Sequence, residues 1–249
     1  MYGQYNRDLG KEVDREETWW WLKKGDLKPE TEVLLCAAQE QALRTNYVKF
    51  HIDRTVESPL CRLCGEKGEH ITHLISECKK LAQKEYKRRH DNVARIVHWK
   101  LCGLFQLEKA EKWYEHQPNG VIESDNVKIL WDFNIQCDHV IECRRPDIVV
   151  VLKKEKECKI IDIAVPGDCR ICIKKTEKVE KYEELKREIR KIWAMKKVEV
   201  IPIVVGALGA VSNKLDKWIE KLGIHIRIEL LQKTALLGTA RILRRILES

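Results

Sequence analysis

The sequence contains no run of eighteen apolar residues, so we expect no helix that crosses a membrane. Its first residues, MYGQYNRDLGKEVDREE, are polar and charged and lack the apolar core of a secretory signal peptide. Internal repeats and low-complexity tracts are also absent. Without a secretory signal, the ten cysteines are expected to be thiols or metal ligands rather than disulfides. These absences favour a reducing compartment, the nucleus or the cytoplasm.

The bulk composition is that of an ordinary globular protein. The 249 residues allow one sizeable domain with an appendage or two small ones, and 44% of them are hydrophobic. The net charge of +8 fits a polyanionic partner. It does not require one, because 39 acidic residues dilute the positive field.

One stretch, residues 145–166, predicts a β-hairpin with a carboxylate on each arm. The first arm, Ile148–Leu152, is almost wholly β-branched, the second, residues 159–165, is nearly as apolar, and lysines and glutamates separate them. Asp147 and Asp162 are costly in such buried arms unless each is paired or binds a metal. Two carboxylates offer the oxygen ligands that Mg²⁺ prefers. The alternative is that Asp147 caps a strand and Asp162 meets a buried lysine or arginine.

A compact cluster of cysteines and histidine predicts a zinc site. Cys61, Cys64, His73 and Cys78 have the spacing C-x2-C-x8-H-x4-C, and three thiolates with one imidazole satisfy tetrahedral zinc. With four protein ligands the ion would be structural, because no coordination position stays open. The alternative is a group of buried cysteines without metal, and His70 is a competing imidazole that we expect to be solvated.

Hydrophobic periodicity and helix-breaking residues predict the remaining elements. Helices are expected from Thr31 onward and over residues 78–101, 174–195, 212–223 and 233–247, and strands over residues 127–136 and 198–211. This order predicts an α/β sheet flanked by helices, with the hairpin at its centre. The helix at 78–101 carries a basic stripe that could lie along phosphates, although a solvated helix face is the default interpretation.

The residues also permit hydrolysis of a phosphodiester. This chemistry needs a metal to activate water, and a lysine that orients the nucleophile or stabilises the developing anion helps it. Lys178 and Lys181 lie three residues apart on the helix after the hairpin, on the same face as Tyr182, so one of them can point inward. The alternative for each lysine is ordinary surface charge.

The order of these motifs resembles the C-terminal region of site-specific non-LTR retrotransposon proteins. The zinc knuckle is followed by RRHDN, RRPD, IIDIAVP, EKVEKYEEL and VIPIVVGALG, and the resemblance covers the chain from Trp19 to its end. That region joins a CCHC knuckle to a restriction-like endonuclease of the PD-(D/E)xK superfamily. The resemblance implies a core of helix, three strands, helix and strand, which agrees with the order derived from periodicity.

The resemblance implies roles for individual residues. Asp147 and Asp162 would bind the catalytic Mg²⁺ or Mn²⁺, and Lys181 would be the catalytic lysine, supported by Tyr182, with Lys178 as its competitor. The superfamily usually places this lysine two residues after the second acid, where this sequence has Ala164, but in this family the lysine lies on the following helix. DNA-contacting or site-supporting positions would be Arg88, Arg89, His90, His139 and Arg145, and Asp168 is a candidate accessory acid.

Composition, motifs and the resemblance together divide the chain. We expect a polar, poorly ordered segment at 1–18, a helical linker region at 19–60, the knuckle at 61–79 and the restriction-like domain at 80–249. Three consecutive tryptophans, residues 19–21, cannot all face one core, so at least one should be exposed.

The activity implied is nicking of DNA in target-primed reverse transcription, with element RNA as a second candidate partner and no membrane. No YADD or FADD acid pair of a polymerase is present. The alternatives are an inactive nucleic-acid-binding remnant with structural zinc and a protein-interaction remnant.

Overall fold

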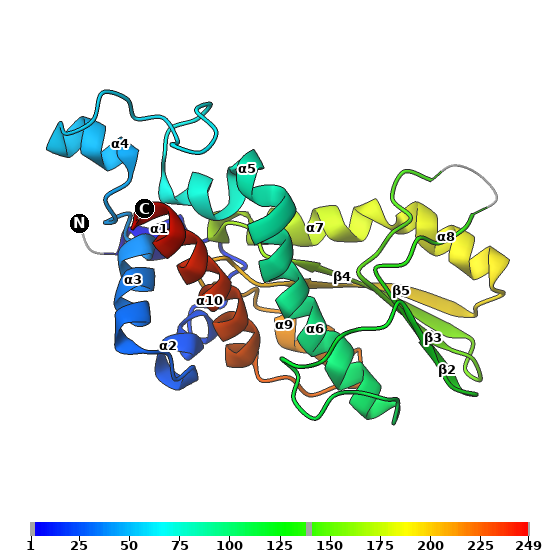
Figure 1. Ribbon diagram of the computed structural model, residues 1–249. Helices are drawn as coiled ribbons and strands as arrows, with labels where there is room; N and C mark the ends of the chain where they lie inside the picture. Colours follow the sequence, from blue (N-terminus) through cyan, green and yellow to red (C-terminus); the bar gives the residue numbers. More distant parts are fainter. Residues whose placement is uncertain (1–2, 138–140, 249) are drawn as a thin grey trace.

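The fold is built on a mixed sheet of five strands (Figure 1). The computed structural model describes residues 3–137 and 141–248. The strands follow one another in the sheet in the order of the sequence: β1 Val121–Glu123, β2 Val127–Trp131, β3 Ile148–Leu152, β4 Glu157–Ala164 and β5 Lys197–Val204. The first four form an antiparallel meander, and β5 pairs parallel to β4. The predicted α/β class with a sheet flanked by helices is therefore confirmed.

The predicted hairpin is confirmed as β3 and β4. The arms pair antiparallel, with Ile148 opposite Ile161 and Leu152 opposite Glu157, and the lysine-rich residues 153–156 form the turn. The β-branched residues of β3 are buried, as is typical of a central strand. By contrast, β2 ends at Trp131, five residues earlier than predicted.

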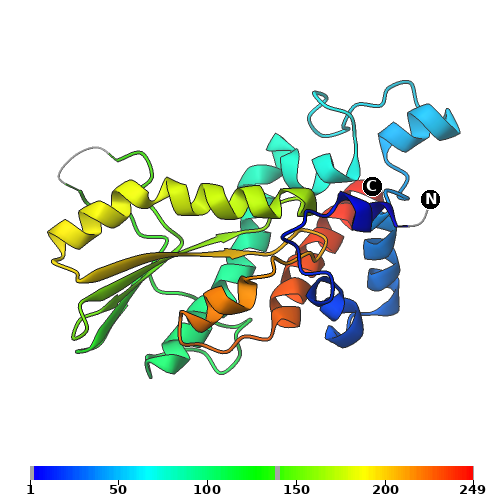
Figure 2. The ribbon, with the colours of Figure 1, turned by 180° about the vertical axis from the view of Figure 1, so that it is seen from behind.

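Helices cover both faces of the sheet. On one face, α7 (Ile171–Lys181) and α8 (Glu183–Ile192) connect β4 to the parallel β5, as Figure 2 shows from behind. Leu185 and Ile189 of α8 pack there against Val149 and Ile160. On the other face, α6 (Lys87–Leu104), α9 (Leu215–Glu220) and α10 (Ile228–Leu247) enclose the second core, which includes Ile161 and Ile163.

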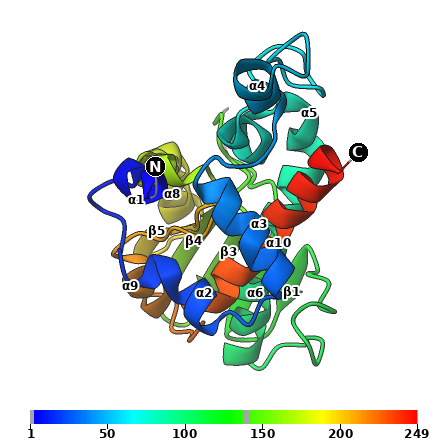
Figure 3. The same ribbon diagram turned by 90° about the vertical axis from the view of Figure 1, so that its left-hand side faces the viewer.

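A third core joins the N-terminal region and the knuckle to α10 (Figure 3). Besides α10, its elements are α1 Gln4–Asp8, η1 Glu17–Trp19, α2 Trp20–Lys24, α3 Pro29–Gln39, η3 His73–Glu77, α5 Lys79–Leu81 and η4 Ala82–Tyr86. Three further short elements are α4 Asn46–Val48, η2 Lys49–Asp53 and η5 Asp168–Arg170. Tyr5, Val13 and Trp21 are buried in this core, so the expectation of a poorly ordered start is wrong for residues 3–18. Trp19 and Trp20 are half-buried and pack against the cores.

Two helices predicted as continuous are broken. The helix predicted over 78–101 begins as α5, passes through the wide turn η4 and continues as α6. In η4, the Tyr86 hydroxyl donates to the carbonyl oxygens of His73 and Leu74 and accepts from the backbone N–H of Cys78, which fixes this turn against the knuckle. The helix predicted over 174–195 breaks at Tyr182, between α7 and α8. None of the helices in the described part of the chain is both long and apolar enough to span a membrane.

Candidate functional site

The two hairpin carboxylates lie side by side at one end of the sheet. Ile148 is opposite Ile161, so the same register places Asp147 opposite Asp162. The backbone N–H of Asp132 donates to the carbonyl oxygen of Asp147 at 2.8 Å, which carries the β2–β3 pairing to this position. Opposite residues of an antiparallel pair project to the same face, with Cβ atoms about 5 Å apart. The register thus brings the two acids together.

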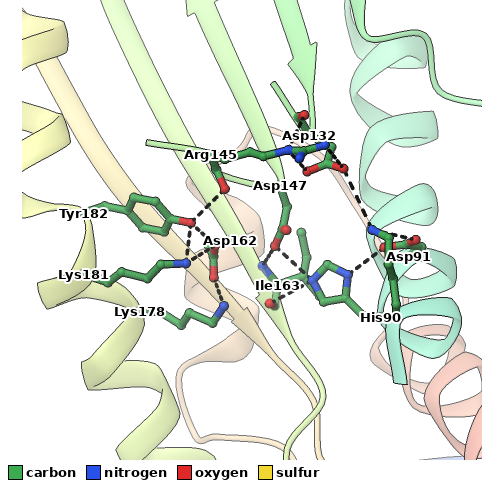
Figure 4. A network of polar contacts seen from close by, with 11 residues as sticks. His90, Asp91, Asp132, Arg145, Asp147, Asp162, Ile163, Lys178, Lys181 and Tyr182 are labelled. Atoms are coloured by element: carbon green, nitrogen blue, oxygen red, sulfur yellow. Dashed lines mark hydrogen bonds and ion pairs between the residues drawn. The ribbon is translucent and has the colours of Figure 1, made fainter. Parts of the chain in front are cut away.

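A histidine from α6 holds the first acid. Nε2 of His90 lies 3.1 Å from Oδ2 of Asp147, and the same oxygen accepts the backbone N–H of Ile163 at 2.6 Å (Figure 4). The other ring nitrogen of His90 lies 3.0 Å from the carboxylate of Asp91. The Asp147 side chain keeps 20% of its surface exposed, and its Oδ1 takes no hydrogen bond within the described residues. This partly exposed carboxylate therefore has one oxygen to which the described residues donate no hydrogen bond.

The contact between His90 and Asp147 favours the charged form of both groups. Burial disfavours the imidazolium, but hydrogen bonds and charges from Asp147 and Asp91 outweigh it and raise the pKa of His90 to about 10. Burial also opposes ionisation of Asp147, and the His90 contact outweighs it and lowers the pKa of this carboxyl. At neutral pH the two side chains form an ion pair.

The second acid is held from the opposite side by α7 and the joint that follows it. Asp162 is 1% exposed, its Oδ2 forms an ion pair with the Lys178 ammonium, and its Oδ1 accepts the Tyr182 hydroxyl at 2.5 Å. Lys181 donates to the Tyr182 oxygen at 2.8 Å and lies 3.8 Å from Oδ1 of Asp162. Both candidate lysines thus converge on Asp162, with Lys178 in the direct ion pair.

The break between α7 and α8 explains how Tyr182 reaches Asp162. Tyr182 leaves the helical backbone conformation, with φ −106° and ψ 9°, and its ring is fully buried against the sheet. Burial first, and then the Asp162 charge, raise the pKa of Tyr182 well above its ordinary value, so this phenol stays a donor. Burial and the neighbouring Asp147 charge raise the pKa of Asp162, although Lys178 and Tyr182 act in the opposite direction.

A basic cleft adjoins the two acids. Its volume is about 380 Å³, and it is bounded by the end of β4 and the residues after it, by α6 and by α7. Five of its lining side chains carry or can carry positive charge: Lys87, Arg89, His90, Lys174 and Lys178. The sequence placed Lys87 only within the basic stripe of the helix at 78–101. Lys174 was not predicted at all, because nothing local distinguishes it from a solvated helix charge. A cleft of this charge attracts an anionic ligand such as a phosphate.

The donor set fits a hard divalent cation on one condition. Two adjacent carboxylates, one of them partly exposed, are oxygen ligands of the kind that Mg²⁺ prefers. The Lys178 ammonium, however, already neutralises Asp162. Metal binding at this place therefore requires Lys178 to move away from Asp162, because both cations would occupy the same side of one buried carboxylate.

The predicted zinc ligands converge. Ligand atoms of Cys61, Cys64, His73 and Cys78 all lie within 4.8 Å of one another. The Sγ atoms of Cys61 and Cys78 are 4.0 Å apart, and Sγ of Cys64 is 3.3 Å from Nε2 of His73. Tetrahedral zinc with ordinary bond lengths separates two sulfurs by about 3.8 Å and sulfur from nitrogen by about 3.6 Å. This Cys₃His cluster therefore has the composition and size to hold a zinc ion.

The knuckle turn has the local geometry that the ligands need. Gly65 has φ +67° and donates its N–H to the carbonyl oxygen of Cys61 at 2.8 Å, and a side chain at this left-handed position would be strained. Glu69, fully buried behind the turn, accepts from the guanidinium of Arg62 at 2.7 Å. His70 is exposed, as expected for an imidazole outside the cluster.

The residues predicted to contact DNA have different environments. Arg88 is exposed, and Arg145 is exposed and paired with Asp132 at 2.8 Å. Arg89 is 2% exposed and donates to Thr239 Oγ1 and to the carbonyl oxygens of Ile75 and Val165. This burial is at odds with a DNA contact by Arg89, which instead joins α6 to α10 and to the end of β4. His139 lies outside the described residues.

Asp168 has a structural role rather than that of an accessory acid. Its carboxylate is buried and accepts the backbone N–H groups of Leu208 and Ala210, each at 2.8 Å, and the Tyr5 hydroxyl at 2.8 Å. These bonds tie the N-terminal segment to the loop after β5. Both carboxylate oxygens of Asp168 thus already accept hydrogen bonds within the fold.

Compared with known protein families, the sequence matches none, and it matches no curated protein. A function for this chain is therefore inferred from the chemistry of its own residues.

Proposed function

We propose that this chain is a metal-dependent endonuclease module that hydrolyses a DNA phosphodiester and nicks its target. The supporting observation is the pairing of Asp147 with Asp162 across the hairpin, beside a basic cleft and within reach of two lysines. The arrangement expected of a PD-(D/E)xK core is a helix, three antiparallel strands, a helical crossover and a parallel strand. We include that fold assignment, nuclear DNA as substrate and a retrotransposon context in the proposal.

Each residue of the site would have its own role in this reaction. Asp147 and Asp162 would hold a Mg²⁺ or Mn²⁺ ion, with His90 and Tyr182 fixing the orientation of the two carboxylates. When bound, such an ion activates water and neutralises charge that develops on the phosphate. Lys178, released from Asp162, lines the cleft and is placed to orient the water or to stabilise the anion. Lys181 keeps its hydrogen bond to Tyr182 and supports the joint.

The direct test is nicking of supercoiled plasmid by the purified chain in Mg²⁺ or Mn²⁺, with a chelator as the blank. Asp162→Asn keeps the size of the side chain and its bond to Tyr182 but removes the charge, so we expect nicking to fall by at least about 100-fold. Asp125→Asn, in the exposed β1–β2 turn, is the matched control and should nick as wild type does. DNA binding, measured by fluorescence anisotropy, should survive in both variants. Equal nicking by wild type and Asp162→Asn would refute the proposal.

A second candidate function is nucleic-acid binding without catalysis. The observation that favours it is that each acid already has a cationic partner, His90 for Asp147 and Lys178 for Asp162. Buried ion pairs of this kind also occur for purely structural reasons. A folded, zinc-loaded chain that binds DNA but nicks none in either metal would establish this alternative.

A further inference from the structure

A second group of metal-ligating side chains lies between α6 and the loop that leads to β1. His98 and Cys102 are one helical turn apart on α6, and His116 comes from the loop. All three are buried, and their ligand atoms lie within 4.8 Å of one another. His98 is about 12 Å along α6 from His90, so this group belongs to neither of the sites above.

Hydrogen bonds alone do not satisfy the three side chains. Nδ1 of His98 lies 2.8 Å from Nε2 of His116 and 3.5 Å from Sγ of Cys102. A neutral imidazole nitrogen either carries one hydrogen or offers one lone pair, so Nδ1 can serve one of these neighbours well and not both. A cation among the three atoms would accept a lone pair from each of them.

We propose that His98, Cys102 and His116 bind a zinc ion, in addition to the ion of the Cys₃His knuckle. One thiolate and two imidazoles are donors that zinc accepts and that hard cations such as Mg²⁺ do not prefer. Around tetrahedral zinc, nitrogen and sulfur ligands are about 3.6 Å apart and two nitrogens about 3.3 Å apart. The observed 3.5 Å between Nδ1 of His98 and Sγ of Cys102 matches this geometry. Nδ1 of His98 and Nε2 of His116 are 2.8 Å apart and would need to separate by only about half an ångström.

A cavity beside the cluster has room for the fourth ligand. Its volume is about 280 Å³, and both histidines line it together with polar side chains that include Glu108, Gln117 and Asn119. A water molecule in this cavity completes the tetrahedron. The ligands come from α6 and from the loop, so the ion fastens the connection between α6 and β1 to the helix.

Metal content of the full chain, purified with zinc and then dialysed, tests the proposal. We expect two zinc ions per wild-type chain and one in Cys64→Ser, which disables the knuckle. We expect one also in His116→Gln and in Cys102→Ser. Cys158→Ser, which alters a buried thiol outside both clusters, is the matched control and should retain two. One zinc in wild type and none in Cys64→Ser would overturn the proposal, as would two in His116→Gln.

Reconstitution with Co²⁺ gives a test that needs no variant to fold. The knuckle supplies three thiolates and the second site one, so their thiolate-to-cobalt absorption differs in strength. A titration of the metal-free wild-type chain should show two steps, of which one is strong and one weak. A single step that ends at one equivalent would overturn the proposal.

Discussion

Replacement of Lys178 by methionine tests whether the hairpin acids bind a metal, as proposed, or have a structural role alone. Methionine keeps an unbranched apolar stem and deletes the charge. The Asp162 side chain is 2% exposed and would retain only Tyr182 at 2.5 Å and Lys181 at 3.8 Å. Loss of one partner of a buried pair costs about 3–5 kcal/mol, because the other charge stays buried without compensation. For a chain of this length about 2 °C corresponds to 1 kcal/mol, so we expect the Tm to fall by about 6–10 °C.

A divalent cation should reverse much of this loss. Lys178→Met removes the cation that competes for Asp162, so Mg²⁺ should bind the variant more tightly than the wild type. An ion present at 100 times its dissociation constant stabilises the folded state by about 2.7 kcal/mol, which corresponds to about 5 °C here. The assay is thermal unfolding followed by circular dichroism, in a chelator and again in about 10 mM Mg²⁺, at least 100 times a dissociation constant of about 0.1 mM.

The control for this experiment is Lys186→Met on α8, whose lysine pairs at 3.0 Å with Glu183, a side chain that is 44% exposed. An exposed pair contributes at most about 1 kcal/mol, so the control should unfold close to wild type in both buffers. Unchanged stability of Lys178→Met in chelator would refute the structural reasoning. A loss of stability that Mg²⁺ does not reverse would show that the acids are not metal ligands.

Three further predictions concern other groups. The pKa of His90 is about 10 in the folded chain against about 6.5 unfolded, so its stabilising contribution is complete below pH 6.5 and disappears as pH rises to 10. Urea unfolding from pH 6 to 10 should show this decline in wild type and a flatter profile in His90→Gln. Cys64→Ser should release the knuckle zinc and lower the Tm by several degrees, whereas an unchanged metal content would contradict the ligand assignment. Arg89→Met should lower stability by about 3–5 kcal/mol, because it removes three hydrogen bonds of a buried guanidinium. Arg88→Gln should instead reduce the salt dependence of DNA binding by about one phosphate contact. The opposite assignment of these two effects would refute the argument from burial.

Short-range patterns were sufficient to predict much of the site. The β-branched run of β3 and the apolar run of β4 identify the hairpin, and its register follows from which residues are buried. That register brings Asp147 to Asp162, so the pair could be predicted before its surroundings were known. The zinc knuckle could also be predicted from a short-range pattern, because the spacing of Cys61 and Cys64 places both thiolates on one turn.

Long-range contacts account for what the sequence did not predict. Arg89 reads as part of a basic stripe, and its burial depends on Thr239, which lies 150 residues away. The residues around Tyr182 favour an unbroken helix, and the break arises because the phenol bonds Asp162 on a strand. Likewise, His116 joins His98 only after the loop folds back on α6. The secondary-structure preferences of neighbouring residues cannot indicate any of these long-range partners.

The pairing of Asp147 with Asp162 by strand register makes the site tolerant of some length changes and sensitive to others. The turn at 153–156 lies at the far end of the hairpin, so extra residues there would lengthen only the solvated tip. Removal of a single residue inside β4 would turn Asp162 to the opposite face and direct Ile161 or Ile163 toward α7. Among natural variants of this chain, length differences should therefore accumulate at the hairpin tip, while the count of residues between Pro146 and the tip, and between the tip and Pro166, stays fixed.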